Sequence, residues 1–164
     1  MEVSAVPVAA AAAVWLAAGV RLAVTDLRTG RLPTRLIWPA AGIVWALYAT
    51  ASLVRAEPDG LIGAALGAAM CGALMAAVHF VHPPSLGFGD VRLSVLNGLL
   101  CGWWGWQVAL AGLAAGFVLA LPEALVVLAR HGLRESRPLG PYLLAGAAAS
   151  AGWAAATRGL VPAG

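Results

Sequence analysis

Residues 60–81, GLIGAALGAAMCGALMAAVHFV, contain no aspartate, glutamate, lysine or arginine. A helix of this length rises about 33 Å, which is enough to cross a hydrocarbon core of about 30 Å. Similar apolar runs fill most of the chain: 62% of its residues are hydrophobic, 10% are charged and the mean hydropathy is +0.88. Soluble domains carry about 25% charged residues. The sequence therefore predicts an all-α polytopic transmembrane helical bundle of about six spans, forming a single domain over residues 1–164.

Interruptions of the apolar runs by charged residues, glycine and proline indicate where the helices end. They predict helices over residues 3–25, 36–54, 60–81, 90–104, 106–129 and 139–157. The tryptophans at 103, 104 and 106 are expected to form an aromatic belt at a membrane face. The three G-x-x-x-G spacings are close to the number that twenty glycines give by chance, so they predict no particular helix contact.

The positive charges of the chain are all arginines, and they fall mainly on one side of the predicted bundle. One side carries Arg21, Arg28, Arg31, Arg35, Arg92, Arg130, Arg134 and Arg137, and the other carries Arg55 and Arg158. The positive-inside rule makes the first side cytoplasmic. We expect a multi-pass protein of a bacterial inner membrane, with the lipid bilayer as its surroundings. No basic stretch alternates with aromatic residues, so nucleic acid is not an expected partner.

Only three aspartates occur, and two of them, Asp26 and Asp90, fall on the predicted cytoplasmic side. Carboxylates near hydrocarbon are costly and usually have a function. Two that converge can share a proton and activate a water for attack on a peptide carbonyl. The glycines of Gly87-Phe88-Gly89-Asp90 are expected to allow positive φ or a close approach of a substrate backbone. Asp59 lies on the opposite side and is excluded from this site.

Three stretches together resemble the type IV prepilin peptidases. They are Asp26–Pro33 (DLRTGRLP), Gly87–Leu93 (GFGDVRL) and Arg137–Tyr142 (RPLGPY). In order, they are similar to the family's aspartate followed by an aliphatic-Pro pair, its G-x-G-D-x-K-L and its Pro-aromatic-Gly-Pro. Two residues depart from the pattern: Arg92 replaces a lysine and Leu139 replaces an aromatic residue.

The resemblance implies a membrane-embedded aspartic endopeptidase that cleaves leader peptides of type IV prepilin-like precursors on the cytoplasmic side. It implies Asp26 and Asp90 as catalytic residues. It also implies that six residues bind substrate or shape the loops: Gly87, Gly89, Arg92, Pro33, Gly140 and Pro141. Larger members carry a cytoplasmic cysteine-rich zinc segment and a methyltransferase activity. This sequence is not expected to contain that segment, and the resemblance leaves methylation unsupported.

No metal or organic cofactor is expected, because an aspartic mechanism needs none and Cys71 and Cys101 lack a zinc-ligand spacing. Glu123 has two open interpretations. The first is structural: Glu123 pairs with an arginine such as Arg130, or it is protonated. The second is a contact with the substrate. Arg92 also has two open interpretations. It could tune the pKa of Asp90 or bind a substrate carboxylate, or its side chain could simply snorkel to the membrane surface.

Two other functions stay open. One is another G-x-G-D intramembrane aspartic protease, of the presenilin or signal-peptide-peptidase kind; the other is a small proton-coupled transporter without enzymatic activity. The aspartates also have a non-catalytic interpretation: Asp26 would be a charge at a helix end among the lipid headgroups, and Asp90 would be a helix N-cap. The sequence does not specify the precursor, the pilus, secretion or competence system that it serves, or the oligomeric state.

Overall fold

A computed structural model describes residues 5–30, 32–81, 87–131 and 139–160. This part of the chain is helical and contains no strand, which confirms the predicted fold class. The helices are α1 (Ala5–Thr29), α2 (Thr34–Arg55), α3 (Asp59–Val81), α4 (Phe88–Gly102), α5 (Trp106–His131) and α6 (Gly140–Arg158). Helices α1, α2 and α3, together with Trp106–Val126 of α5, are long and apolar enough to cross a membrane.

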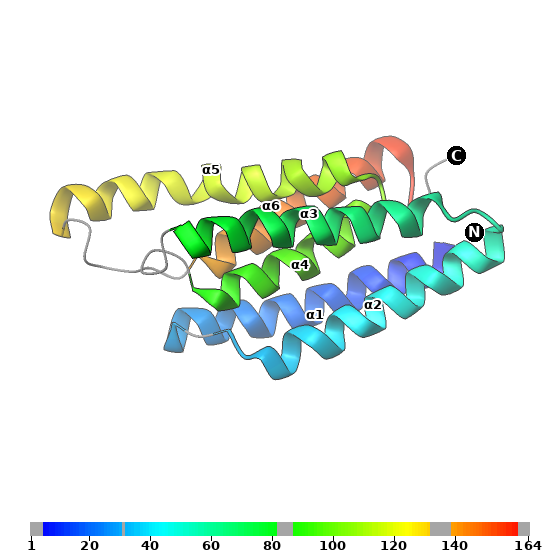
Figure 1. The fold of residues 1–164 in the computed structure, drawn as a ribbon, viewed down its shortest axis with the longest axis horizontal. Helices are drawn as coiled ribbons and strands as arrows, with labels where there is room; N and C mark the ends of the chain where they lie inside the picture. Colours follow the sequence, from blue (N-terminus) through cyan, green and yellow to red (C-terminus); the bar gives the residue numbers. More distant parts are fainter. Residues whose placement is uncertain (1–4, 31, 82–86, 132–138, 161–164) are drawn as a thin grey trace.

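The six helices run side by side in one elongated bundle (Figure 1). The start of α1 and the end of α6 lie at one end of the bundle, and the ends of α1, α3 and α5 and the starts of α2, α4 and α6 lie at the other. The shortest helix, α4, contacts all five others. Residues 96–104 are all buried. A central helix does not need the hydrophobicity of a lipid-facing one, which explains why α4 has the weakest apolar signal in the sequence.

Helices α3 and α4 meet through glycine. A Cβ atom added to Gly67 would lie 2.5 Å from the backbone oxygen of Gly98, and one added to Gly102 would lie 2.5 Å from that of Gly63. Such distances are far below van der Waals contact, so side chains larger than hydrogen do not fit at this contact. Small residues let the backbones of membrane helices approach closely. Two of the three G-x-x-x-G spacings therefore form one helix contact, although their number alone predicted none.

The third spacing, Gly112 and Gly116 in α5, packs against α6. A Cβ atom on Gly116 would lie 2.9 Å from the Cα atom of Leu143, and one on Gly112 would lie 3.3 Å from that of Ala147. Gly146 of α6 faces the backbone of Gly112 and Gly116 just as closely. Helices α3 to α6 are thus joined in pairs at glycine contacts.

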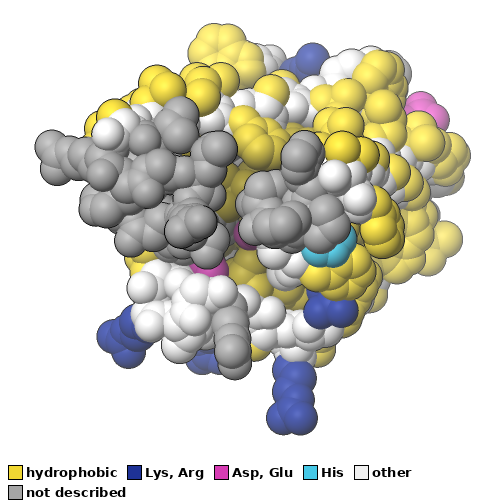
Figure 2. Space-filling view, turned by 60° about the vertical axis from the view of Figure 1, so that its left-hand side comes forward, with side chains coloured by type: hydrophobic (Ala, Val, Ile, Leu, Met, Phe, Trp, Pro, Cys, Tyr) yellow, Lys and Arg dark blue, Asp and Glu magenta, His cyan; other side chains and the backbone are white. Residues whose placement is uncertain are grey.

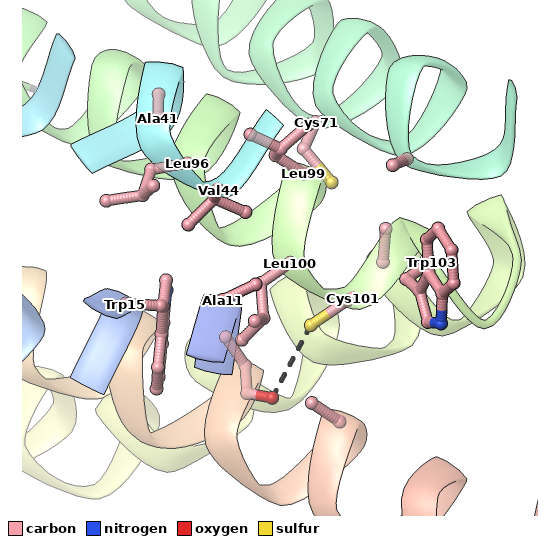
Figure 3. Close-up of a cluster of buried hydrophobic side chains, with 14 of the residues drawn as sticks. Ala11, Trp15, Ala41, Val44, Cys71, Leu96, Leu99, Leu100, Cys101 and Trp103 are labelled. Atoms are coloured by element: carbon pink, nitrogen blue, oxygen red, sulfur yellow. Dashed lines mark hydrogen bonds between the residues drawn. The ribbon is translucent and has the colours of Figure 1, made fainter. Parts of the chain in front are cut away.

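Helices α1 and α2 are attached through larger side chains. Trp15 of α1 and Val44 of α2 belong to the same buried cluster as Leu96, Leu99 and Leu100 of α4, part of which is drawn in Figure 3. Cys101 also lies there, and its Sγ donates to the carbonyl oxygen of Ala147, 3.4 Å away. Interdigitated side chains rather than backbone contacts hold this pair of helices to the rest.

The tryptophans at the end of α4 do not form the expected belt. Trp103 and Trp104 are only 3% and 5% exposed. Their indole nitrogens donate to the carbonyl oxygens of Leu160 and Gly159 at 3.3 and 2.9 Å. The ring of Trp103 also stacks on Tyr48, with 4.5 Å between centroids. A buried indole N–H group needs a hydrogen-bond acceptor, and here the segment after α6 supplies the acceptors. Of the three tryptophans, only Trp106 is exposed.

Candidate active site

A cavity of about 340 Å³ opens at the end of the bundle where α1, α4 and α6 bring their functional motifs. Its lining combines both predicted aspartates with their neighbours: Asp26, Gly30, Leu32, Gly87, Phe88, Gly89, Asp90 and Arg92. Figure 2 turns this end toward the viewer: arginine side chains project at its margins, small areas of acidic side chain show near its centre, and another acidic side chain lies at the right-hand edge of the view. The structure thus brings the first two sequence motifs to one site.

Asp26 lies in the last turn of α1, because this helix continues to Thr29 instead of ending near residue 25 as predicted. The helix ends at Gly30, whose φ is +61° and whose amide donates to the carbonyl oxygen of Asp26 at 2.7 Å. The Asp26 side chain is only 5% exposed. It therefore turns into the bundle and does not lie among headgroups at a loop edge.

The first turn of α6 provides a partner for Asp26. The backbone amide of Gly140 donates to Asp26 Oδ2 at 3.1 Å. A Cβ atom on Gly140 would lie 2.6 Å from the same oxygen. The first amides of a helix and its dipole favour a negative charge placed there. The third motif thus joins the site through the Gly140 backbone, beside Pro141 in the first turn of α6.

Asp90 is the third residue of α4 and lies in its first turn. Gly87 is the N-cap, with φ −67° and ψ 140°, and its carbonyl oxygen accepts from the Asp90 amide at 3.0 Å. The interpretation of Asp90 as the N-cap of this helix is therefore wrong. Asp26 and Asp90 line the same cavity, which is the placement that the predicted pair requires.

Gly87 and Gly89 do not have positive φ, so the first of their two predicted roles is wrong. The second, a close approach of a substrate backbone, stays a prediction. A Cβ atom on Gly89 would lie 2.9 Å from Cβ of Leu32, which follows α1 in the chain, and one on Gly87 would lie 3.3 Å from Asp90 Oδ2. Gly89 thus lets the α1–α2 connection approach the start of α4. Leu32 was noted in the sequence only as part of the Asp26–Pro33 motif, and its contact with Gly89 was not predicted.

Arg92 lines the cavity next to Asp90 but makes its contacts elsewhere. Its guanidinium donates to the hydroxyl of Thr34 and lies over the ring of Phe88, 4.6 Å from the centroid. Thr34 is the first residue of α2, and Pro33 is the N-cap of that helix. Arg92 therefore joins α2 to the start of α4, a contact that neither interpretation from the sequence included.

Glu123 of α5 accepts a hydrogen bond from the hydroxyl of Tyr142 in the first turn of α6. This partner supports the structural interpretation of Glu123, and the predicted pairing with an arginine stays a prediction. Several residues of the sequence analysis lie outside the described residues: Arg31, Arg134, Arg137, Pro138 and the side chain of Arg130.

Metal ligation has no support in the part of the chain that the structure describes, where no three His, Cys, Asp or Glu side chains are grouped. Cys71 and Cys101 are both buried free thiols. They pack as small hydrophobic side chains.

These observations define a helical membrane protein with two carboxylates in one cavity at the end of its bundle. The sequence model of the Type IV leader peptidase family matches residues 10–129, which is most of the chain, so the protein belongs to this family. The family resemblance predicted from three motifs is confirmed. The matched region includes Asp26 and Asp90 and ends before Gly140. A search among curated proteins and one among solved structures each found no match.

Proposed function

We propose that this peptidase is an aspartic endopeptidase with Asp26 and Asp90 as its catalytic pair. The observation that carries the proposal is that one cavity is lined by both carboxylates, one from the end of α1 and one from the start of α4. The family membership supports hydrolysis of a leader peptide bond. It favours this function over the transporter and over cleavage within transmembrane helices.

In the proposed mechanism the two carboxylates share one proton. The ionised member takes a proton from a water molecule, which attacks the scissile carbonyl, while the protonated member donates a hydrogen bond to the carbonyl oxygen. The tetrahedral intermediate then breaks its C–N bond as a proton passes to the leaving nitrogen. The Gly140 amide holds Asp26 Oδ2 at 3.1 Å. This bond fixes one carboxylate against the other while charge develops.

The proposed substrates are prepilin-like precursors cleaved at the cytoplasmic face. Among the described residues, Arg21, Arg28, Arg35 and Arg92 lie in the helix halves toward the cavity, and Arg55 and Arg158 lie at the far ends of α2 and α6. This distribution supports a cytoplasmic cavity by the positive-inside rule. A bacterial inner membrane is the proposed location.

Cleavage of prepilin-like precursors by membranes containing each variant tests the pair. Asp26→Asn and Asp90→Asn should each lower cleavage at least about 1,000-fold, as loss of a catalytic group does, with normal insertion. Asp59→Asn is the matched control, because Asp59 is exposed and begins α3 at the other end of the bundle. Cleavage at the wild-type rate by either of the first two variants would contradict the proposal.

The side of cleavage is tested separately. A cysteine at Thr29 should react with an impermeant maleimide only from the cytoplasm, and a cysteine at Asp59 only from outside. The native Cys71 and Cys101 are buried and provide little background. Labelling of Thr29 from outside would place the cavity on the wrong side for a cytoplasmic leader.

A further inference from the structure

Asn97 is a buried amide in the middle of α4, only 8% exposed. It lies outside the cavity and outside all three sequence motifs. A buried amide is costly unless its oxygen and nitrogen both find partners. In the central helix of a membrane bundle, these partners must come from the neighbouring helices.

Both ends of the Asn97 amide are hydrogen-bonded to other helices. Oδ1 accepts from the indole nitrogen of Trp15 in α1 at 3.0 Å. Nδ2 donates to the backbone oxygen of Leu143 in α6 at 3.1 Å. One side chain of α4 thus binds α1 and α6 at the same time.

The same three helices supply the polar groups of the proposed site. Asn97 is seven residues after Asp90, and Trp15 is eleven residues before Asp26, so each lies on the same helix face as its aspartate. The separations along the helices are about 10 and 16 Å. Leu143 is one turn beyond Gly140. Each partner in the Asn97 network is therefore rigidly connected to one polar group of the site.

We propose that Asn97 is a positioning residue, which sets the relative placement of Asp26, Asp90 and the Gly140 amide by joining α1, α4 and α6. The inference rests on the proposed catalytic pair. The two hydrogen bonds of the Asn97 side chain have a fixed direction and length, so they oppose sliding and rotation of α1 against α4. Apolar packing alone resists such movements less specifically. Asn97 touches no reacting atom and acts only through the helices.

The matched control is Tyr48→Phe. Tyr48 of α2 is also buried and donates to the carbonyl oxygen of Leu100 in α4 at 3.1 Å. It therefore makes a hydrogen bond of the same kind to the same helix, on the side toward Trp103 and away from the cavity. Its removal reports what loss of one buried helix–helix hydrogen bond does without involving α1.

The kinetic test uses purified protein and one prepilin-like precursor. Asn97→Leu should lower kcat roughly tenfold or more, because small misplacements of catalytic groups are costly, with KM within about twofold. Trp15→Phe should lower kcat in the same direction. The double variant should be no slower than Asn97→Leu, because the hydrogen bond that Trp15→Phe removes is already lost in Asn97→Leu. Tyr48→Phe should change neither constant by more than about twofold. Equal kcat values for Asn97→Leu and Tyr48→Phe would overturn the inference.

A measurement independent of cleavage separates this inference from the proposed function. Spin labels at Thr29 of α1 and Phe80 of α3, both exposed, report the distance between α1 and the α3–α4 pair. Asn97→Leu should shift or broaden the distance distribution, and Tyr48→Phe should leave it unchanged. Identical distributions in all variants would overturn the positioning role even if Asp26→Asn abolishes cleavage. A shifted distribution supports it even where the chosen precursor is not cut.

Discussion

The α1–α2 hairpin and the glycine-packed block, α3 to α6, are held together by different means. Within the block, Gly63 and Gly67 face Gly102 and Gly98 at distances that exclude a methyl group. Between hairpin and block, the contacts are made by side chains such as Trp15. The block therefore has little freedom to adjust, whereas the hairpin is attached by contacts that individual substitutions can loosen.

The proposed catalytic pair lies across this division. Asp90 and Gly140 belong to the block, and Asp26 belongs to the hairpin. Three contacts cross between them at the cavity: the Gly140 amide on Asp26, Leu32 against Gly89, and Arg92 on Thr34. The geometry of the block is thus fixed by backbone packing, and the proposed catalysis depends on how the hairpin is docked to the block.

The largest effect is expected inside the block. Gly98→Ala places a methyl group against the backbone of Gly67 and 3.0 Å from the Cα of Ala68, so we expect a loss of about 3 kcal/mol of stability. Gly42→Ala and Gly152→Ala are the controls, because nothing lies within 4 Å of either position. Both should be neutral or slightly stabilising, by up to about 1 kcal/mol. Thermal unfolding in detergent measures all three. Equal melting temperatures would mean that α3 and α4 can separate at little cost.

The next effect is expected at the contact of α6 with Asp26. Gly140→Ala puts a methyl group 2.6 Å from Asp26 Oδ2, so the carboxylate or the helix start must move. Cleavage should fall about 100-fold, while stability changes by less than about 1 kcal/mol. Gly152→Ala in the same helix is the control. A Gly140→Ala enzyme with wild-type kcat would show that the amide contact is dispensable.

A smaller effect is expected where Leu32 meets the block. Gly89→Ala should lower cleavage about tenfold through the 2.9 Å contact with Leu32. Gly87→Ala should be milder, about threefold, since its nearest neighbour is 3.3 Å away. Leu32→Gly combined with Gly89→Ala should recover much of the rate, because it removes the Cβ atom that the new methyl group would meet. Failure of this rescue would indicate that the methyl group obstructs the substrate and not the hairpin.

The smallest effect is expected for Arg92→Lys. Lysine keeps the positive charge but loses the planar group that lies over Phe88 while donating to Thr34. A cation–π contact at such a site contributes about 0.5–1 kcal/mol, so the specificity constant kcat/KM should fall about two- to fivefold. A loss above about a hundredfold would mean that the guanidinium contacts the reacting substrate.

The sequence predicted the helices well because their signal is local. Long apolar runs separated by charges, glycine and proline located all six elements within a few residues. The main boundary error was the end of α1: Arg28 and Thr29 were assigned to a loop, but the helix continues to Gly30, whose positive φ stops it. This extension is what buries Asp26.

Tertiary features could not be predicted in the same way. Whether Gly67 faces Gly98, lipid or nothing depends on the rotation of two helices, which one sequence does not fix. Trp103 and Trp104 had the pattern of an aromatic belt because their partners, Gly159 and Leu160, are more than fifty residues away in the chain. The contact of Leu32 with Gly89 also joins residues far apart in the chain, and the Tyr142–Glu123 bond depends on how α5 and α6 are rotated against each other.

The indoles of Trp103 and Trp104 fasten the end of the bundle that lies away from the cavity. The ring of Trp103 stacks on Tyr48, and both indole nitrogens donate to carbonyl oxygens that follow α6. The end of α4 and the segment after α6 therefore cannot separate without leaving two buried N–H groups without acceptors, which is costly.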